Sequence, residues 1–199
     1  MFPVPDTMKA VRWYGPRNMR LDDVPVPVPG PGDVLLRVDS TGICGSDVHY
    51  YLDGRIGTQV ITDPPLTLGH EFAGVIVRLG KGVAPAIEGV RVAVEPGTPC
   101  GQCEWCRTNH YNVCEKMRFP GGPGCEGAFS AYYVTRAAAC FPIPDTMTMP
   151  QAAMLEPLSV AVHSVELAAL KPGETVAVLG LGPVGLMTAD LARHSGALA

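Results

Sequence analysis

Four cysteines crowd into one short segment, and they constrain the fold of this chain more than any other feature. Cys100, Cys103, Cys106 and Cys114 lie within fifteen positions, and gaps of two residues let neighbouring sulfurs converge on one tetrahedral ion at about 2.3 Å. Their polar, glycine-rich setting argues against cysteines that merely fill a core. An iron–sulfur cluster is the less favoured alternative, because the ferredoxin pattern has a three-residue last gap followed by proline. The segment therefore predicts a structural zinc ion held by four thiolates, with no position open for a substrate.

Composition limits the classes of protein to consider. Of the 199 residues, 47% are apolar and 17% charged, which is enough to bury one full core. Seven cysteines and no secretory pattern at the start favour reduced thiols and a cytoplasmic location. No apolar run reaches eighteen residues, so no membrane span is predicted. The net charge of −4 offers no basic surface for nucleic acid or for a membrane.

Short valine-rich runs fill the first two thirds of the chain. Five of them, bounded by Gly, Pro or Asp, are typical of β-strands: residues 9–14, 33–38, 73–79, 90–94 and 130–135. The segment 24–31 has proline at every second residue, which removes backbone donors that a sheet needs, so we expect an extended connector. The pattern changes at Thr148, which can cap a helix with Gln151 at its third position. Pro157 should bend that helix beside Glu156.

The last part of the chain has the pattern of a nucleotide-binding unit. Residues 175–180 form a continuous apolar run, which predicts a buried parallel strand. A glycine motif and a predicted helix over residues 185–196 follow, so the helix N-terminus would face a pyrophosphate. The expected cofactor contacts are Gly180, Gly182, Pro183, Val184 and Gly185. The acidic ribose contact should fall about twenty residues further on. We therefore expect the chain to stop before this domain is complete.

A second group of candidate metal ligands lies nearer the N-terminus. Cys44 and the pair His70-Glu71 sit where strand-like runs end or begin. With a carboxylate from Glu71 or Glu156, they would give zinc three protein ligands and leave a fourth position for water or substrate. Taken alone, each is more often a packing residue, since free cysteine is among the most buried residue types.

The motifs together resemble the zinc-dependent medium-chain dehydrogenases, in order and approximate spacing, over essentially the whole chain. The resemblance rests on Cys-Gly-Ser-Asp-x-His at 44–49, Gly-His-Glu at 69–71, the four cysteines, Glu-Pro-Gly at 95–97, Glu-Pro-Leu-Ser at 156–159 and the glycine motif at 180–185. Within that family, residues 49–57 and Glu156 resemble the sorbitol and xylitol dehydrogenase branch. Val90 departs from the family, which usually has an aspartate there. That departure puts a local turn or ion pair in doubt, but not the zinc chemistry.

The resemblance implies a fold and a set of roles. The fold is a mainly β GroES-like catalytic domain over residues 1–155, followed over residues 156–199 by the first strand and helix of a Rossmann domain. Cys44, His70 and Glu71 would bind a catalytic zinc, and Glu156 would either ligate that zinc or bond to its water. The remaining roles fall to neighbouring residues: Asp47 would accept the ring N–H of His70, Ser46 and His49 resemble a proton relay, and Tyr50 and Phe119 would form pocket walls.

The implied reaction is oxidation of a secondary alcohol of a polyol to a ketose. Zinc would act as a Lewis acid, and the hydride would pass to NAD or NADP. A homo-oligomer is implied for the complete enzyme. The competing hypothesis is a zinc-binding fragment without catalysis, because a dinucleotide domain needs two βαβαβ halves. The sequence does not identify the preferred polyol.

Overall fold

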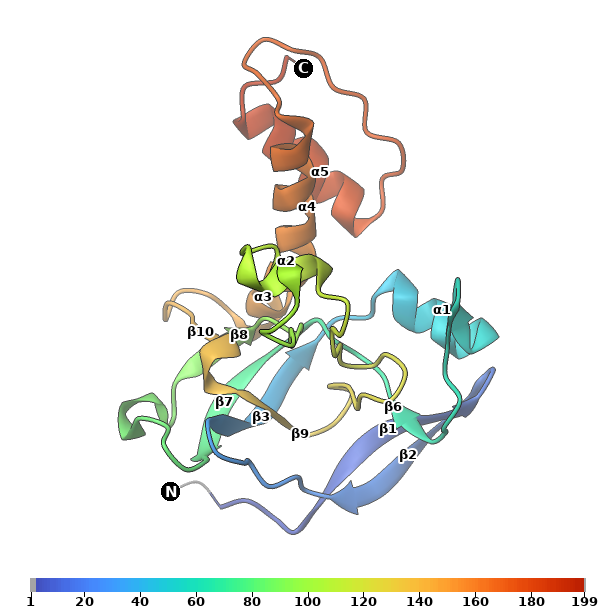
Figure 1. Ribbon diagram of the computed structural model, residues 1–199, viewed down its shortest axis with the longest axis vertical. Coiled ribbons are helices and arrows are strands. Elements are labelled where there is room, and N and C mark those ends of the chain that lie inside the picture. Colours follow the sequence, from blue (N-terminus) through green and yellow to red (C-terminus); the bar gives the residue numbers. More distant parts are fainter. Residues whose placement is uncertain (1–2, 199) are drawn as a thin grey trace. The chain divides into compact units, whose positions relative to one another are not determined.

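The computed structural model describes residues 3–198. The chain divides into two compact units, Met1–Ala153 and Met154–Ala199, which are taken separately below (Figure 1). Within the described residues, no helix is both long enough and apolar enough to cross a membrane.

An antiparallel five-stranded sheet forms the centre of the first unit. Its strands are β3 (Asp33–Thr41), β7 (Phe72–Leu79), β8 (Arg91–Val94), β9 (Tyr132–Arg136) and β10 (Cys140–Pro142), in the order β10-β8-β7-β3-β9. Strands β3 and β7 pair from Val34 opposite Leu79 to Thr41 opposite Phe72. The end of β3 therefore lies beside the start of β7, and the segments beyond these two ends are brought together.

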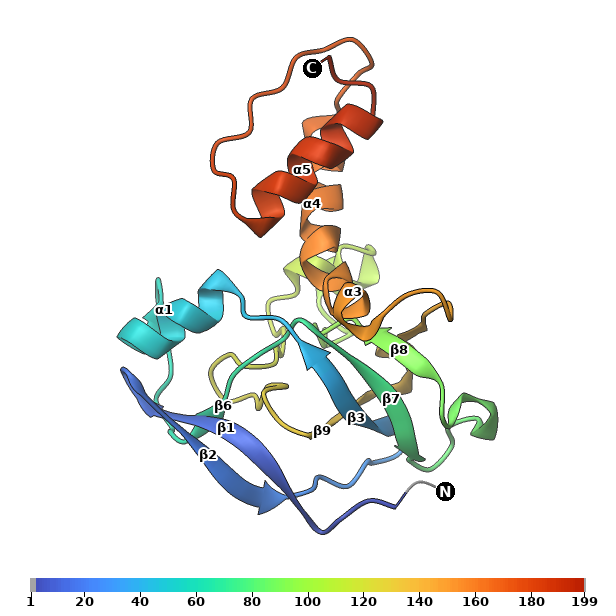
Figure 2. The ribbon, with the colours of Figure 1, turned by 180° about the vertical axis from the view of Figure 1, so that it is seen from behind.

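A second, smaller sheet completes the β architecture of this unit (Figure 2). It has the order β2-β1-β6, with strands β1 (Thr7–Gly15), β2 (Asn18–Pro25) and β6 (Leu66–Thr67). Helix α1 (Gly45–Asp53) leads into a short hairpin of β4 (Arg55–Ile56) and β5 (Gln59–Val60). Gly54 ends α1 in the left-handed conformation, with φ of 67°. Glycine adopts this conformation without a steric penalty, so the chain can turn directly into the hairpin.

Two groups of buried side chains hold the first unit together. The larger group lies on the five-stranded sheet: Val34, Leu36, Phe72, Ile76, Val92, Val94 and Ala128. The smaller group joins α1 to the second sheet: Trp13, Tyr50, Ile61, Leu66 and Leu68. Burying each large apolar side chain stabilises the fold by about 1.5–3 kcal/mol. Helix α3 (Met149–Ala153) also packs against β3, β7 and β8.

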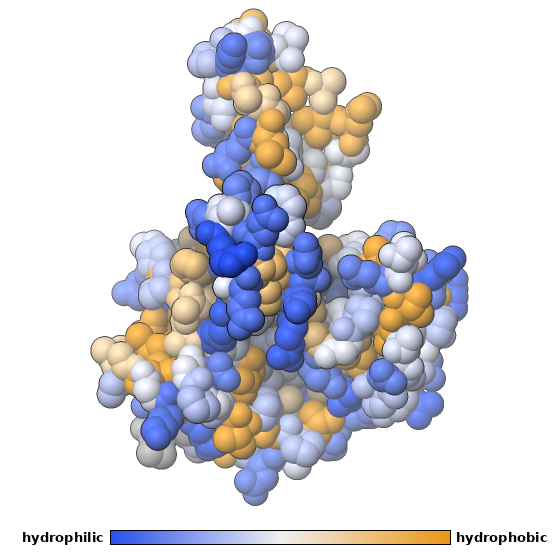
Figure 3. All heavy atoms as spheres, in the orientation of Figure 1, coloured by the Kyte–Doolittle hydropathy of each residue, from blue (hydrophilic) through white to orange (hydrophobic). Residues whose placement is uncertain are grey.

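The segment with four cysteines forms a lobe with little regular structure. It contains the short helix α2 (Glu104–Arg107) and the 3₁₀ turn η2 (Tyr111–Val113), and the surface over α2 is mostly hydrophilic in Figure 3. Two further 3₁₀ turns, η1 (Pro85–Ile87) and η3 (Ala137–Ala139), connect strands of the main sheet. The lobe's large apolar side chains Trp105, Tyr111 and Val113 are exposed, so the lobe buries little core of its own.

The second unit consists of α4 (Leu155–Ala168) and α5 (Pro183–His194), which pack against each other. The predicted strand at 175–179 is wrong. Among the described residues, that run makes only one isolated bridge, between Thr175 and Leu198, and Leu179 is 98% exposed. A buried parallel strand needs neighbours on both edges, and the described part of this unit supplies none.

Among the described residues, the sequence predicted five of the ten strands and did not predict α1 or α2. The five predicted strands are present as β1, β3, β7, β8 and β9. Strand β2 was not predicted, and its last two residues overlap the proline-rich connector. The helix cap at Thr148 is confirmed, because its backbone N–H donates to Gln151 Oε1 at 2.9 Å. The prediction of a single helix bent at Pro157 is wrong, because α3 ends at Ala153 and a separate helix, α4, begins at Leu155. Pro157 lies in the first turn of α4, where a missing N–H leaves no helical bond unmade.

Candidate functional site

Three candidate ligands meet at the adjoining ends of β3 and β7. Cys44 follows β3, and His70 and Glu71 directly precede β7, so the strand pairing brings them together. Their ligand atoms all lie within 4.8 Å of one another. The backbone N–H of Gly42 also donates to the carbonyl of Glu71 at 2.6 Å. The structure thus places a thiol, an imidazole and a carboxylate at one point.

The carboxylate of Asp47 connects the two ligand-bearing segments. Its Oδ2 accepts the backbone N–H of Cys44 at 2.9 Å, and its Oδ1 accepts the backbone N–H of Gly69 at 3.0 Å. The side chain is buried. The distance from Oδ1 to His70 Nδ1 is 3.8 Å, too long for a hydrogen bond. The prediction that Asp47 accepts the ring N–H of His70 is therefore wrong for this structure. Both oxygens of Asp47 instead accept backbone N–H groups.

Gly42 makes room for the Glu71 carboxylate. A Cβ added at Gly42 would lie 2.2 Å from Glu71 Oε2, well inside van der Waals contact. Glu71 can therefore reach this position only because residue 42 has no side chain. Sequence reasoning overlooked Gly42, and the one signal available was a glycine two residues before Cys44.

A cavity of about 660 Å³ opens beside His70. Its lining includes Ser46, Tyr50, Ile56, Gln59, His70 and Phe119. The ring of Phe119 lies 5.0 Å from the ring of His70, measured between centroids. Tyr50 and Phe119 are therefore confirmed as cavity walls. Of the three candidate ligands, His70 borders this space, which is large enough for a small molecule.

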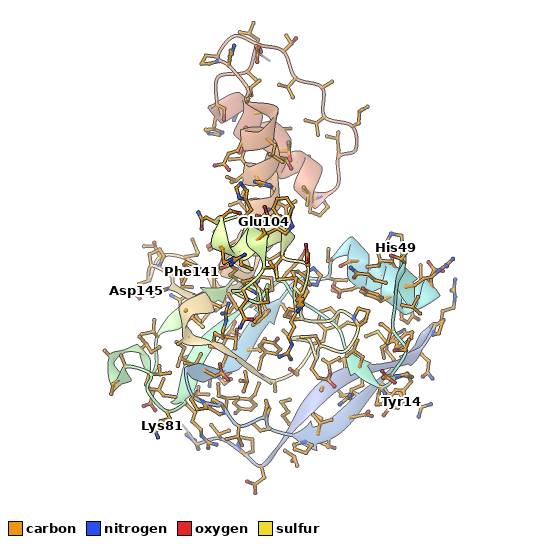
Figure 4. All side chains as sticks on the ribbon, in the orientation of Figure 1. Tyr14, His49, Lys81, Glu104, Phe141 and Asp145 are labelled. Carbon is orange, nitrogen blue, oxygen red and sulfur yellow. The ribbon has the colours of Figure 1, made fainter. Side chains whose placement is uncertain are left out.

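The two residues of the expected proton relay lie in different surroundings. Ser46 lines the cavity beside His70, whereas His49 borders a separate hollow with Pro16 and Arg55. His49 lies on α1 (Figure 4), its side chain is 66% exposed, and its Nδ1 is 4.0 Å from Asp53 Oδ2. Glu156, the other expected catalytic residue, lies in the first turn of α4, in the second unit. Its role stays a prediction from the sequence.

The four cysteines of the lobe converge as a tetrahedral site requires. The Sγ–Sγ distances are 3.5 Å for Cys103–Cys106 and 3.9 Å for both Cys100–Cys106 and Cys103–Cys114. Zinc–sulfur bonds of about 2.3 Å in a tetrahedron place the sulfurs about 3.8 Å apart. All four sulfurs lie within 4.8 Å of one another. The donor set fits zinc in both chemistry and spacing.

Backbone donors favour the ionised form of one of these sulfurs. Cys100 Sγ accepts the backbone N–H groups of Gln102 and Cys103, each at 3.4 Å, and these bonds lower the pKa of Cys100 to about 6. Burial, reinforced by the sulfur of Cys103, raises the pKa of Cys106 to about 12. Four sulfurs at this spacing can all be thiolates only beside a cation, which offsets their mutual repulsion.

The lobe is closed at its base by a backbone bridge. The N–H of Thr98 donates to the carbonyl of Arg118 at 2.9 Å, and the N–H of Arg118 donates back at 3.0 Å. Both ends of the cysteine segment are thereby fixed beside each other. The four ligands are contributed by a single closed loop.

The glycine motif forms a tight turn into α5. Gly180 has a φ of 98°, and a Cβ added at Gly185 would lie 1.9 Å from the Gly180 carbonyl oxygen. Gly182 is the N-cap of α5, and Pro183 begins the helix. No atom lies within 4 Å of the position that a Cβ on Gly182 would take. The first and third glycines are required by the turn itself, while the second leaves the backbone open to an approaching group.

The fold and both ligand groups identify the family of this chain. Residues 30–145 match the alcohol dehydrogenase GroES-like domain, and the chain belongs to that family, with the mainly β fold that the sequence predicted. It is 44% identical over 194 residues to sorbitol dehydrogenase of Bacillus subtilis, an alignment covering 98% of this chain and 55% of that protein. It is also 44% identical over 184 residues to D-xylulose reductase A of Aspergillus niger, with 92% and 51% covered.

A solved structure with the same fold carries a dinucleotide. It is a candidate zinc-binding dehydrogenase from Sinorhizobium meliloti bound to NADP, with a TM-score of 0.88 and 38% identity. The match covers 97% of this chain and 55% of that one. The chain spans about half the length of the curated relatives it matches.

Proposed function

We propose that this chain supplies the zinc-binding catalytic domain of a polyol dehydrogenase, which oxidises a secondary alcohol of a sorbitol- or xylitol-like substrate to a ketose. The observation that carries the proposal is the meeting of Cys44, His70 and Glu71 at one point, with His70 and Ser46 lining the same cavity. A thiol, an imidazole and a carboxylate form a three-ligand set that leaves zinc an open position. The sorbitol dehydrogenase and xylulose reductase relatives support the substrate class.

The residues of this site have separate tasks. Cys44, His70 and Glu71 would hold the metal, with Asp47 fixing the backbone on which two of them lie. When bound, zinc supplies a Lewis acid that lowers the pKa of a substrate hydroxyl. The Ser46 hydroxyl would accept the proton of that group as it releases its own. The exposed ring of His49, three residues further along α1 and bordering a separate hollow, would be the outlet to solvent. Phe119 and Tyr50 would orient the substrate and keep water from the reacting carbon.

The four-cysteine lobe and the glycine motif before α5 have separate roles in the proposed activity. A second zinc, bound by the four cysteines of the lobe, would be structural, because no ligand position remains for a substrate. The backbone N–H groups at the start of α5 would face the pyrophosphate of the dinucleotide that accepts the hydride. NAD and NADP are both retained in the proposal, because the pyrophosphate contacts are common to the two.

A hybrid enzyme tests the proposal. Joining residues 1–199 to the C-terminal remainder of the Bacillus subtilis sorbitol dehydrogenase should give sorbitol- and xylitol-dependent reduction of NAD. Cys44→Ser should abolish nearly all of that activity, since a hydroxyl is a poor substitute for a thiolate on zinc. Cys140→Ser, at a cysteine outside both ligand groups, is the matched control. Near-normal polyol oxidation by the Cys44 variant would overturn the assignment.

A zinc-binding module without catalysis is the alternative, and one observation favours it for the chain by itself. Residues 175–179 form no strand, so the described part of the second unit holds no parallel sheet across which a dinucleotide could bind. The hybrid separates the two functions: activity in the hybrid supports the dehydrogenase, and an inactive hybrid with both zinc ions bound supports the module.

A further inference from the structure

One polar side chain in the cavity has no part in the proposed reaction. Gln59 lies on β5 and lines the same cavity as Ser46 and His70. Its carboxamide oxygen Oε1 accepts a hydrogen bond from the Tyr50 hydroxyl at 3.3 Å. Tyr50 is only 5% exposed, so packing fixes the donor. Gln59 itself is exposed, and the bond to Tyr50 orients its amide at the cavity wall.

The hydrogen bond determines which atoms of the amide can bind a ligand. A carboxamide has one acceptor oxygen and two N–H donors on its nitrogen. Tyr50 engages the oxygen, and within residues 3–198 the bond to Tyr50 is the only side-chain hydrogen bond seen for Gln59. The two N–H groups are left to donate to an incoming group. Ile56, Val60 and Phe119 are apolar lining residues, while Ser46, His70 and Arg118 are the other lining side chains that can donate. The Gln59 amide is therefore one of few side-chain donors available to a ligand in this cavity.

The hairpin that carries Gln59 is tied to the rest of the first unit. Ile56 pairs with Gln59 across the β4–β5 turn, and the N–H of Ile61 donates to the carbonyl of Gly54 at 3.0 Å. Ile61 is buried with Trp13 and Tyr50 in the smaller core group. The backbone that carries Gln59 is thereby anchored beside the C-terminal end of α1, the helix on which Ser46 lies.

We propose that Gln59, oriented by Tyr50, determines specificity by binding a hydroxyl of the polyol other than the one that reacts. This inference rests on the proposed function. A polyol carries a hydroxyl on each of several neighbouring carbons, whereas a simple secondary alcohol has only one. A second hydrogen bond in the cavity therefore favours polyols and fixes which carbon is presented to Ser46 and the metal ligands.

Nuclear magnetic resonance on the zinc-loaded chain tests the contact directly. The chain has three glutamines, Gln59, Gln102 and Gln151, so the side-chain amide signals of the other two are internal references. Xylitol should shift the Gln59 amide signals in a saturable way and leave the references unchanged. It should also shift the ring signals of His70, the reporter at the metal end. An equal concentration of 2-butanol should shift His70 and leave the Gln59 amide unaffected.

Three variants assign the effect to the hydrogen bond. Gln59→Leu should raise the xylitol concentration for half-maximal His70 response about three- to tenfold, as expected for one lost neutral hydrogen bond, and leave that for 2-butanol unchanged. Tyr50→Phe should have a smaller effect in the same direction, because the amide is then no longer oriented. Thr58→Val, on the same hairpin but outside the cavity lining, should behave like the unchanged chain.

The outcomes separate this inference from the proposed function. If xylitol affects His70 equally in the unchanged chain and in Gln59→Leu, the specificity role of Gln59 is overturned while the proposed function stands. If neither xylitol nor 2-butanol affects His70, the alcohol-binding site is overturned, and the inference with it.

Discussion

The Oδ1 atom of Asp47 accepts the backbone N–H of Gly69 at 3.0 Å, joining residues 22 positions apart. The second carboxylate oxygen binds the backbone N–H of Cys44, so one buried side chain sets the separation of the two ligand segments. This relationship concerns backbone groups, and it would be made with or without a metal in the site.

Replacing Asp47 by Asn should weaken both the fold and the open metal site. An amide offers one acceptor and would turn its N–H₂ group toward a backbone donor. Losing a hydrogen bond to a buried charged group costs about 1.5–3 kcal/mol, and we expect that reduction in the free energy of unfolding by urea. Zinc affinity of the open site should fall with it. Asp53→Asn, on the same helix but with a side chain 62% exposed, should change neither quantity.

Replacing Gly42 by Ala should displace the Glu71 carboxylate, because the added Cβ would lie 2.2 Å from Glu71 Oε2. We expect zinc affinity at the open site to fall at least tenfold, with zinc at the four-cysteine lobe retained. Competition with a chromophoric chelator measures the two sites in one titration. Gly45→Ala is the control, since a Cβ there meets nothing within 4 Å. Equal affinities in the two variants would contradict the steric role of Gly42.

The double variant Cys103→Ala, Cys106→Ala should lower the zinc content from two ions per chain to one. Two thiolates are too few for a closed zinc site, and the lobe has little core to hold it in shape without metal. Elemental analysis of protein purified from zinc-containing medium measures the loss. Cys140→Ser should keep both ions. Unchanged zinc content in the double variant would reject the four-cysteine site.

The thiol of Cys140 should resist alkylation until the solution is strongly alkaline. Burial raises the pKa of Cys140 to about 12, and only the thiolate reacts. At pH 8 iodoacetamide should modify it roughly a thousandfold more slowly than an ordinary thiol of pKa about 8.5, and the rate should rise about tenfold per pH unit. The folded state holds this proton more tightly than the unfolded state does. The resulting contribution to the free energy of unfolding is present below about pH 8.5 and is lost as the pH rises toward 12. Peptide mass spectrometry follows the reaction, and rapid labelling at pH 8 in the folded chain would contradict the burial argument.

The chain by itself should bind NAD no more tightly than about 1 mM and should not oxidise polyols. The start of α5 provides one helix N-terminus, and such a contact contributes only about 0.3–1 kcal/mol. Residues 175–179 lack the neighbouring strands that would build the rest of a dinucleotide crevice. Calorimetric titration with NAD and a sorbitol oxidation assay measure both properties. Micromolar binding or steady turnover would show that this reasoning is wrong.

Local patterns predicted half of the described strands of the first unit, because these five are short apolar runs with clear boundaries. The four cysteines at 100–114 could likewise be selected from residue type and spacing. Cys44, His70 and Glu71 were assigned through the family resemblance, because each residue alone fits a packing role as well. The backbone role of Asp47 could not, because it depends on the register of β3 against β7. The space at Gly42 depends on the same pairing. The run 175–179 has the composition of a strand, but composition cannot supply the neighbours that a parallel strand requires.

The bridge between Thr98 and Arg118 bears on the order in which the two metal sites form. All four cysteine ligands lie inside the loop that this bridge closes, so zinc can capture them as soon as that short stretch of chain exists. The open site must wait until β3 and β7 have paired, because Cys44 and His70 are joined only through that long-range contact. Closing a longer loop costs more chain entropy and slows assembly. Metal uptake during folding should therefore be sequential, with the lobe loaded first and the open site last.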